Sequence, residues 1–353
     1  MSEANLPAGR IHSDRAPRNR VRRPLVSSVL LVDKPKGLTS HDVVSRVRRA
    51  VGQREVGHTG TLDPMATGLL VVTLGAATRI GRFLESADKG YTATLALGRA
   101  TDTEDADGRT IATAPVRELS RAELEAAARS LVGELDQRVP AYSAVRVGGE
   151  RLHKKARRGE EVERPVRRIV VHELEVGAIS NRGPEVEVEL RARVSKGTYV
   201  RTLGVELAAR LSLPGHLTAL RRSSVGTLSV EHAVSLDAIS REGDPSRVTG
   251  AIPIDRALAH LPVIDVAEAE LEWVRHGRPL RPDQLHLRRG GFERGDPILL
   301  LHGDAVVAVA FAEVSSRELL STDPLASSRE APERALAYAC VLVGSVDPTG
   351  VGR

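Results

Sequence analysis

Two neighbouring segments of alternating apolar and polar residues constrain the fold of this chain most. Residues 185–194 alternate at every position, residues 167–178 alternate less strictly, and an Asn-Arg-Gly-Pro sequence stands between them. A period of two is typical of a strand that has one face on a core and the other in water. Gly and Pro favour a tight turn between such strands. We therefore predict an antiparallel strand pair.

Further strands and helices surround this pair in the sequence. Thr39 stands at an N-cap position, and Ser120 with Glu123 forms a capping-box pattern. Strands and helices that interleave at a spacing of about 10 to 15 residues are typical of α/β and α+β folds. We predict such a catalytic body. The expected strands are residues 27–35, 69–74 and 91–97, and the expected helices are residues 39–51, 119–131 and 202–211.

The composition excludes several classes of protein. The 353 residues are 41% apolar and 27% charged, as in ordinary globular proteins, and this length allows two domains. No apolar stretch approaches the roughly 18 residues that span a bilayer, and the N-terminus lacks the apolar core of a secretion signal. The single cysteine, Cys340, excludes an intramolecular disulfide and a cysteine-based zinc cage. We expect a cytoplasmic protein whose net charge of +5 favours a polyanionic partner.

Charge and composition divide the chain into segments. Residues 1–26 hold six arginines against two acidic residues, so we expect a disordered basic arm. A catalytic domain is expected at residues 27–245 and a linker at residues 246–262, where the composition changes. Short apolar runs between Gly-rich turns predict a small β-rich domain at residues 263–348. Residues 314–334 are rich in Ser, Glu and Pro, which predicts a flexible insertion within that domain.

Basic residues and tyrosines are placed unevenly. Residues 146–168 hold nine Arg or Lys residues against four Glu, a pattern that fits a solvated face as well as a nucleic-acid contact. Only six lysines accompany 45 arginines, yet Lys34, Lys89 and Lys196 lie in tight Lys-Gly or Lys-Pro motifs. An ammonium and a guanidinium are not interchangeable at such positions. Tyr91 and Tyr199 come after two of these motifs, where an aromatic ring suits base stacking or the edge of a core.

Two motifs do not fit the metal or phosphate sites that they suggest. Residues 101–108 (Thr-Asp-Thr-Glu-Asp-Ala-Asp-Gly) are similar to a calcium loop, but the twelfth loop position is Ala114 instead of a glutamate. The Gly-His-Thr-Gly sequence from Gly57 is not followed by the Gly-Lys-Ser/Thr of a phosphate-binding loop. The sequence therefore favours chemistry without a metal or an organic cofactor.

Asp63 is the carboxylate with the most unusual surroundings. It precedes a proline, as an N-cap residue at the start of a helix often does. It also lies among many Gly and Thr residues, which allow sharp turns and close approach by another molecule. A carboxylate on a rigid turn can act as a nucleophile toward a sugar or base carbon. The residues themselves leave both interpretations open.

Seven short motifs occur in order between about residue 28 and residue 230. They are Leu-Leu-Val-Asp-Lys-Pro-Lys-Gly, Gly-His-Thr-Gly-Thr-Leu-Asp-Pro-Met-Ala-Thr-Gly, Asp-Lys-Gly-Tyr, Thr-Asp-Thr-Glu-Asp-Ala-Asp-Gly, Tyr-Ser-Ala, Ser-Lys-Gly-Thr-Tyr-Val-Arg-Thr and Leu-Arg-Arg. Together they resemble the bacterial tRNA pseudouridine synthase B (TruB) family. This resemblance implies an α+β catalytic domain on a central mixed, largely antiparallel sheet flanked by helices. It also implies a small, β-rich, PUA-like RNA-binding domain at the C-terminus.

The implied activity is the isomerisation of uridine 55 in the T loop of tRNA to pseudouridine. The N-glycosidic bond breaks, the base rotates and it rejoins the ribose through C5, so no metal or redox cofactor is needed. The implied partner is the T stem-loop of tRNA. We expect a monomer without an obligate protein partner.

The resemblance also implies roles for individual residues. Asp63 is the implied nucleophile, toward either ribose C1′ or base C6, and Arg201 lies beside it and favours its ionised form. Tyr91 matches the aromatic residue that stacks on the target base, and its hydroxyl is a candidate for moving the C5 proton. Tyr199 and Leu220 match further residues of the uracil pocket.

Other matched positions concern the RNA around the target. His58 matches the residue that supports the loop after the target nucleotide has flipped out. Lys34 lies in the first motif, where shaping of the backbone near the substrate is implied. Residues 138–168 match a mobile RNA-gripping segment, although its Arg-Leu-His-Lys-Lys-Ala-Arg-Arg-Gly stretch lacks the tyrosine often found there. The implied contacts to the RNA backbone are Arg151, Lys154, Lys155, Arg157 and Arg158.

Two other functions fit parts of the sequence. A catalytically silent tRNA-binding or tRNA-folding protein would share the basic surface, but it needs no carboxylate beside Arg201 and Tyr91. A cofactor-free nucleoside hydrolase would use a similar carboxylate, but a small substrate needs neither a basic segment nor an RNA-binding domain.

Overall fold

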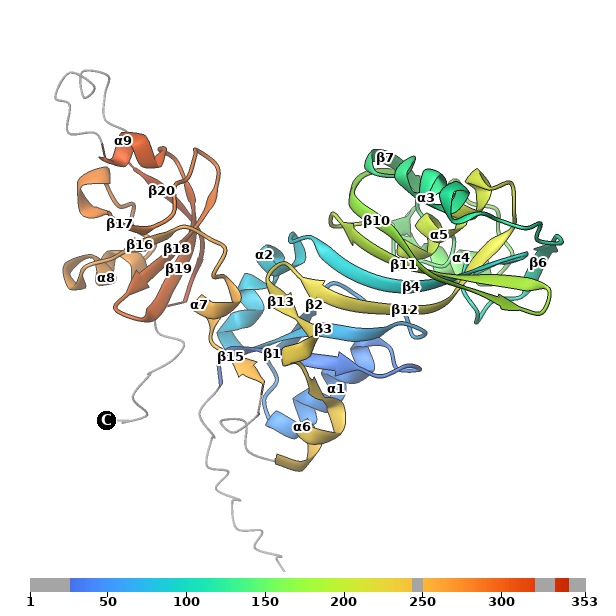
Figure 1. Ribbon diagram of the computed structural model, residues 1–353. Helices are drawn as coiled ribbons and strands as arrows, with labels where there is room; N and C mark the ends of the chain where they lie inside the picture. Colours follow the sequence, from blue (N-terminus) through green and yellow to red (C-terminus); the bar gives the residue numbers. More distant parts are fainter. Residues whose placement is uncertain (1–25, 243–249, 321–333, 343–353) are drawn as a thin grey trace, which may run out of the picture.

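A computed structural model describes residues 26–242, 250–320 and 334–342 of the chain. Within these residues the fold is mixed α+β, with a large mixed sheet flanked by helices and a smaller β unit toward the C-terminus (Figure 1). The fold class predicted from the sequence is therefore confirmed. The expected basic arm, apart from Val26, and most of the expected insertion at 314–334 lie outside the described residues.

The large sheet is largely antiparallel. Its main path runs β14-β1-β3-β12-β4-β11-β10-β7, and β2, β13 and β15 pair with β3, β12 and β1. Two of its pairings are parallel, β1 with β14 and β12 with β3. The strands are β1 (Ser28–Lys34), β2 (Val56–Thr59), β3 (Thr67–Leu74), β4 (Lys89–Leu97), β7 (Gly133–Arg138), β10 (Val166–Arg182), β11 (Glu185–Val194), β12 (Gly215–Val225), β13 (Leu228–Ser229), β14 (Val234–Ser235) and β15 (Ala251–Ile252).

The predicted antiparallel pair is the long hairpin of β10 and β11. The two strands pair from Val171 opposite Val194 to Arg182 opposite Glu185. Gly183 takes a φ of +63° in the turn, a conformation that a residue without a Cβ adopts at little cost. Two small ribbons lie outside the large sheet: β5 (Arg99–Thr101) with β6 (Thr110–Thr113), and β8 (Arg146–Val147) with β9 (Glu150–Arg151).

The predicted helix starts are confirmed by their caps. Thr39 and Asp42 form a capping box at the start of α1, and Ser120 and Glu123 form another at the start of α3. None of the helices in the described segments is both long and apolar enough to cross a membrane. The α-helices are α1 (Ser40–Val51), α2 (Gly81–Glu85), α3 (Arg121–Arg129), α4 (Leu152–Arg157), α5 (Val200–Arg210), α6 (Leu236–Glu242), α7 (Ile254–Ala257), α8 (Glu268–Arg275) and α9 (Ser316–Leu320); short 3₁₀ turns are η1 (Gly75–Ile80), η2 (Val230–His232) and η4 (Pro282–Gln284).

Strand β1 is buried on both faces. Leu30 and Val32 belong to an apolar cluster that includes side chains of α1, α3, α5 and α6. Val29 and Leu31 point to the opposite face, where the cluster includes side chains of α2, α7 and the C-terminal unit. Successive residues of a strand face opposite sides of its sheet, so a run of large apolar residues is expected where both sides are covered.

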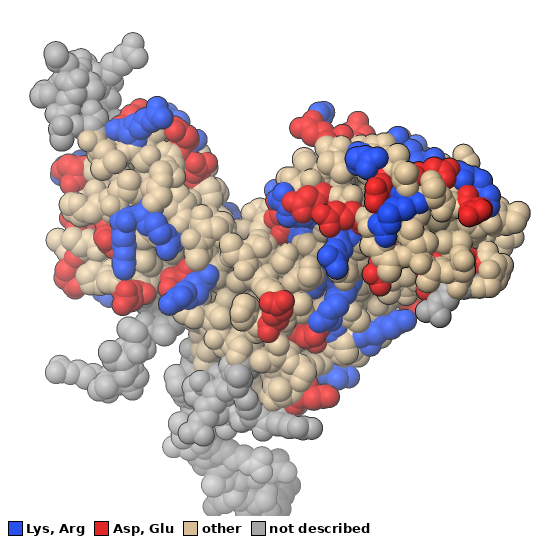
Figure 2. Space-filling model, viewed as in Figure 1, with Lys and Arg blue, Asp and Glu red and all other residues tan. Residues whose placement is uncertain are grey.

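The C-terminal unit is built on a second sheet of order β17-β16-β18-β19-β20. Part of the expected linker is ordered, because β15 pairs with β1 and α7 packs between the two units. Acidic and basic side chains are interspersed over both units on the face shown in Figure 2. The strands of this sheet are β16 (Val263–Asp265), β17 (His286–Arg289), β18 (Pro297–His302), β19 (Ala305–Ala312) and β20 (Leu336–Val341).

Two arginines near the start of α2 connect the units. Arg79 Nη1 donates to the carbonyl of Val341 at 2.8 Å, and Arg82 Nη2 donates to that of Ala339 at 2.9 Å. The rings of Phe83 and Phe311 lie 6.0 Å apart between their centroids. The C-terminal sheet therefore packs on the same segment that leads into β4 and the cavity described next.

Candidate active site

A cavity of about 910 Å³ lies where α2, β4, β12 and the segment between β11 and α5 meet. Five of the residues singled out in the sequence line it: Asp63, Tyr91, Tyr199, Arg201 and Leu220. The others are not among its lining residues: Lys34, His58, Arg151, Lys154, Lys155, Arg157 and Arg158.

Asp63 lies on a tight turn and not at the start of a helix. The Ala66 N–H donates to the Asp63 carbonyl at 3.1 Å, and strand β3 begins at the next residue, Thr67. The helix-cap interpretation of the Asp-Pro sequence is therefore wrong. Proline presets the backbone for a β-turn as readily as for the first turn of a helix, and here the strand leaves no room for a helix.

The Asp63 turn is tied to the start of α1. Ser40 Oγ donates to the Leu62 carbonyl at 3.1 Å and accepts from the Leu62 N–H at 2.8 Å. Lys34 is fully buried, and its Nζ donates to the carbonyls of Leu38 at 2.6 Å and Pro64 at 3.4 Å. Burial lowers the pKa of Lys34 to about 8, and the charge of Asp63 opposes this shift. Lys34 thus supports the turn from behind instead of lining the cavity.

Arg201 holds the Asp63 carboxylate from the side of the core. Its Nε donates to Asp63 Oδ2 at 2.8 Å, and the arginine side chain is 3% exposed whereas that of the aspartate is 36% exposed. Nη1 donates to the Thr103 carbonyl and Nη2 to the Tyr142 carbonyl at 3.0 Å. A planar guanidinium with three fixed partners has one orientation, so the carboxylate that it contacts is held at the cavity wall.

The acidic turn at residues 101–108 supports this arginine. Asp105 Oδ2 lies 3.7 Å from Arg201 Nη1, and the other carboxylate oxygen accepts from the Thr103 hydroxyl and the Asp107 N–H. Burial raises the pKa of Asp105, while its hydrogen bonds and Arg201 act in the opposite direction. The sequence excludes a calcium loop here, and the motif is one of the seven that carry the family resemblance. No pattern within it indicates that Asp105 contacts Arg201.

The two tyrosines come from different elements. Tyr91 is half-buried on β4. Tyr199 occupies the N-cap position of α5, where its N–H donates to Gln137 Oε1 at 2.8 Å and its carbonyl accepts from Gln137 Nε2 at 3.2 Å. Burial raises the pKa of the Tyr199 phenol, so the hydroxyl stays protonated at neutral pH.

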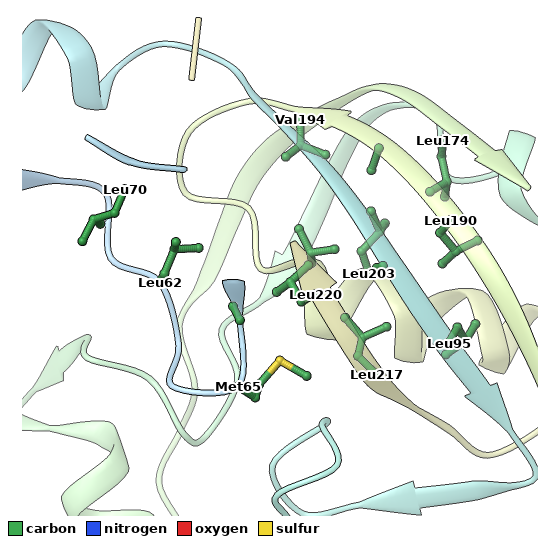
Figure 3. Close-up of a cluster of buried hydrophobic side chains, with 14 of the residues drawn as sticks. Leu62, Met65, Leu70, Leu95, Leu174, Leu190, Val194, Leu203, Leu217 and Leu220 are labelled. Carbon is green, nitrogen blue, oxygen red and sulfur yellow. The ribbon is translucent and has the colours of Figure 1, made fainter. Parts of the chain in front are cut away.

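Leu220 forms part of an apolar floor. It is buried on β12 and belongs to the cluster in Figure 3, together with Leu62 and Met65 from the Asp63 turn and Leu203 from α5. Leu62 and Met65 therefore anchor the turn in the core, while the Asp63 carboxylate is left at the surface of the cavity.

His58 lies on β2, beside the cavity wall instead of in it. Its Nδ1 atom is buried without a hydrogen-bond partner in the structure. Burial and, next, the charge of Arg222 lower the pKa of His58. The imidazole is therefore neutral at neutral pH.

Several cations at the cavity were not singled out as site residues from the sequence. Lys89 and Arg222 are buried in its wall, and both stand in motifs that carried the resemblance, Asp-Lys-Gly-Tyr and Leu-Arg-Arg. Their burial depends on the three-dimensional packing of β4 and β12, which no local pattern reveals. Among the described residues, no group of three or more His, Cys, Asp or Glu side chains is placed to hold a metal ion.

Comparisons with known proteins match this chain to one family. The model of the TruB family pseudouridylate synthase N-terminal domain matches residues 48–200. A tRNA pseudouridine synthase B of Geobacillus kaustophilus (strain HTA426) is 47% identical over 262 residues, which cover 72% of this chain and 91% of that relative. The enzyme of the same name from Mycobacterium sp. (strain KMS) is 43% identical over 254 residues, covering 72% of this chain and 84% of the relative.

A solved structure shows the same fold over most of the chain. A chain in the crystal structure of a Cbf5-Nop10-Gar1 complex superimposes with a TM-score of 0.68 at 25% identity, covering 89% of this chain and 84% of that one. With a relative at 47% identity matched over 91% of its length, this chain belongs to the TruB family of pseudouridylate synthases.

Proposed function

We propose that this chain is a tRNA pseudouridine synthase that isomerises uridine 55 of the T loop, with Asp63 as its nucleophile. One observation carries the proposal: the half-buried Asp63 carboxylate is held by the buried Arg201 in a cavity that Tyr91 and Tyr199 also line. The cavity, at about 910 Å³, is large enough for a nucleotide. Relatives named tRNA pseudouridine synthase B support the choice of RNA.

The side chains are suited to breaking and reforming a bond to C1′. The Asp63 carboxylate stabilises or traps the electron-poor centre, at C1′ or at C6 of the base, as carboxylates do in glycoside hydrolysis. The C1′–N1 bond breaks, the base turns, and a C1′–C5 bond forms. N1 ends with a proton, and the proton of C5 is released. Tyr91 stacks on the base and offers its hydroxyl for that proton transfer.

Arg201 has an electrostatic and a positioning role in this scheme. Its guanidinium balances the negative charge of Asp63, and its contacts with Thr103 and Tyr142 keep it from turning toward an RNA phosphate. The neutral Tyr199 phenol closes another wall without placing a second negative charge beside Asp63.

The basic segment around α4 is the proposed grip on the RNA backbone. Arg151, Lys154 and Arg157 are exposed, whereas Arg158 is paired with Glu150 and Glu160. Arg158 therefore serves first to hold the segment together. Among the described residues, Arg151, Lys154 and Arg157 have no ion-pair partner, so they can meet phosphates. Such contacts release counterions, so we expect the affinity for RNA to fall steeply as salt increases. The PUA-like identity of the C-terminal unit and the monomeric state belong to the same proposal.

The function is tested with a T-arm hairpin that carries 5-tritiated uridine at the target position. The expected result is release of tritium to water and, after digestion, a nucleoside with the mass of uridine but a different retention time. Binding of the hairpin without tritium release would support the silent tRNA-binding protein instead. Release of free uracil would support a hydrolase.

A further inference from the structure

Two buried cations face each other across the loop that leads to Asp63. Lys89, the first residue of β4, is 7% exposed, and Arg222 on β12 is 1% exposed. A Cβ atom on Gly60 would lie 3.3 Å from Arg222 Nη1 and 3.8 Å from Lys89 Cε. Both side chains therefore reach the same point of the cavity wall, and both line the cavity that contains Asp63.

Backbone carbonyls orient both cations without neutralising them. Arg222 donates from Nε to Leu69 O at 2.7 Å and from Nη2 to Gly60 O at 3.0 Å. Lys89 Nζ donates to the carbonyls of Ala87, at 2.7 Å, and Glu85. Within the described parts of the chain, neither cation has a carboxylate within ion-pair distance. Nη1 of Arg222 and one proton of Lys89 remain available as donors.

Burying the charges of Lys89 and Arg222 side by side costs free energy unless an anion binds between them. Two like charges that are removed from water repel each other, and each loses hydration. Burial and, next, the charge of Arg222 lower the pKa of Lys89 to about 8. An anion between the two would restore charge-assisted hydrogen bonds to both donors.

The rest of the cavity wall favours the same kind of ligand. Positively charged side chains outnumber carboxylates there, which raises the local concentration of anions. The basic lining residues are Arg82, Lys89, Arg167, Arg168, Lys196, Arg201 and Arg222, and the acidic ones are Asp63 and Glu85.

We propose that Lys89 and Arg222 bind one of the two phosphodiester groups that flank the target uridine, and so fix the flipped nucleotide over Asp63. This inference rests on the proposed function, because it takes the ligand to be RNA. A phosphodiester enters the cavity with the flipped nucleotide and matches two adjacent cationic donors. In this assignment Lys89 and Arg222 are substrate-binding residues and take no part in proton transfer.

The alternative is that both residues only stabilise the fold, since Arg222 joins β12 to the Gly60 loop and Lys89 donates to the carbonyl of Glu85, the last residue of α2. The test therefore couples a change in the protein to a change in the RNA. T-arm hairpins are prepared with a neutral methylphosphonate at the phosphate 5′ or 3′ of the target uridine, and their dissociation constants are compared with that of the unmodified hairpin. For the wild-type protein, one of the two methylphosphonates is expected to weaken binding about tenfold.

In Lys89→Gln the penalty for that methylphosphonate should fall below about threefold, because the variant has already lost part of the contact. If the amide prevents folding, Lys89→Met keeps an apolar stem in the buried site and serves in its place. Lys36→Gln is the matched control, because Lys36 is exposed and does not line the cavity. It should retain the tenfold penalty.

Two results would overturn the inference: no penalty at either phosphate in the wild type, or a full tenfold penalty in both Lys89 variants. Tritium release from the unmodified hairpin is measured on the same wild-type sample. If tritium is released but the methylphosphonate penalty is absent or unchanged in the Lys89 variants, the phosphate site is rejected and the proposed function stands. Absence of release would reject the proposed function itself.

Discussion

Arg201 Nε donates to Asp63 Oδ2 at 2.8 Å, although the two residues are 138 positions apart in the sequence. The Arg201 side chain is buried and fixed by backbone carbonyls, whereas the Asp63 side chain is accessible from the cavity. In the proposed function, this relationship makes the turn at Asp63 the site of the chemistry.

Replacing Arg201 by lysine should lower kcat by about 10²-fold, because an ammonium cannot contact Asp63, the Thr103 carbonyl and the Tyr142 carbonyl in one fixed plane. Denaturant titration should also show a loss of about 1–3 kcal/mol in the free energy of unfolding, since buried carbonyls lose their donors. Arg210→Lys on the same helix is the control, because Arg210 is exposed. Equal kinetics for the two variants would contradict this role of Arg201.

Asp105→Asn should lower kcat by about 10-fold or more while leaving KM nearly unchanged. Asp105 contacts Arg201 and not the cavity, so the change loosens the orientation of the guanidinium without removing a substrate contact. Asp107→Asn removes an equal charge two residues away at an exposed position, and its kinetics should match the wild type. A rise in KM alone would show that Asp105 contributes to binding instead.

Gly68→Ala should destabilise the protein more than Gly37→Ala. Both glycines have a left-handed φ, +95° and +90°, so both changes introduce backbone strain of about 1–3 kcal/mol. A Cβ on Gly68 would also lie 2.3 Å from the Arg222 carbonyl, whereas one on Gly37 meets nothing within 4 Å. The clash should cost about 1–3 kcal/mol more in the free energy of unfolding. Equal losses of unfolding free energy for the two variants would show that β12 can shift away from a Cβ at Gly68 without cost.

The affinity for RNA should fall about fourfold between pH 7 and pH 8.5. Lys89 has a pKa of about 8, lowered by burial, Arg222 and Lys196 and raised by Glu85 and Asp88. It is charged at pH 7 and mostly neutral at pH 8.5, so a phosphate contact is lost as pH rises. Dissociation constants measured at low, constant salt provide the test. In Lys89→Gln the same change of pH should have little effect, and an equal decline there would exclude Lys89 as the titrating group.

Local patterns predicted the elements that depend on neighbouring residues. The capping boxes of α1 and α3 follow from residues three positions apart, and the β10–β11 hairpin follows from alternation around a Gly-Pro turn. The helix-cap interpretation of Asp63 failed for the same reason. An Asp-Pro pair suits both a helix start and a β-turn, and only the nearby start of β3 decides between them.

The site could be predicted only in part. Asp63, Tyr91 and Arg201 stand in distinctive motifs, and the structure brings them to one cavity. The burial of Lys89 and Arg222 results from the packing of β4 and β12 against the Asp63 loop, a contact between distant segments. For Lys34 the motif indicated a place near the substrate. Its ammonium group instead donates to the backbone carbonyls of Leu38 and Pro64 and does not line the cavity.

The central claim is that the Asp63 carboxylate carries out the chemistry. Its most direct test is tritium release from a 5-tritiated T-arm hairpin by wild type, Asp63→Asn and the exposed control Asp107→Asn, with binding of the same hairpin measured in parallel. We predict release by wild type and Asp107→Asn, no detectable release by Asp63→Asn, and similar dissociation constants for all three. Turnover by Asp63→Asn at a rate near that of the wild type would contradict the account.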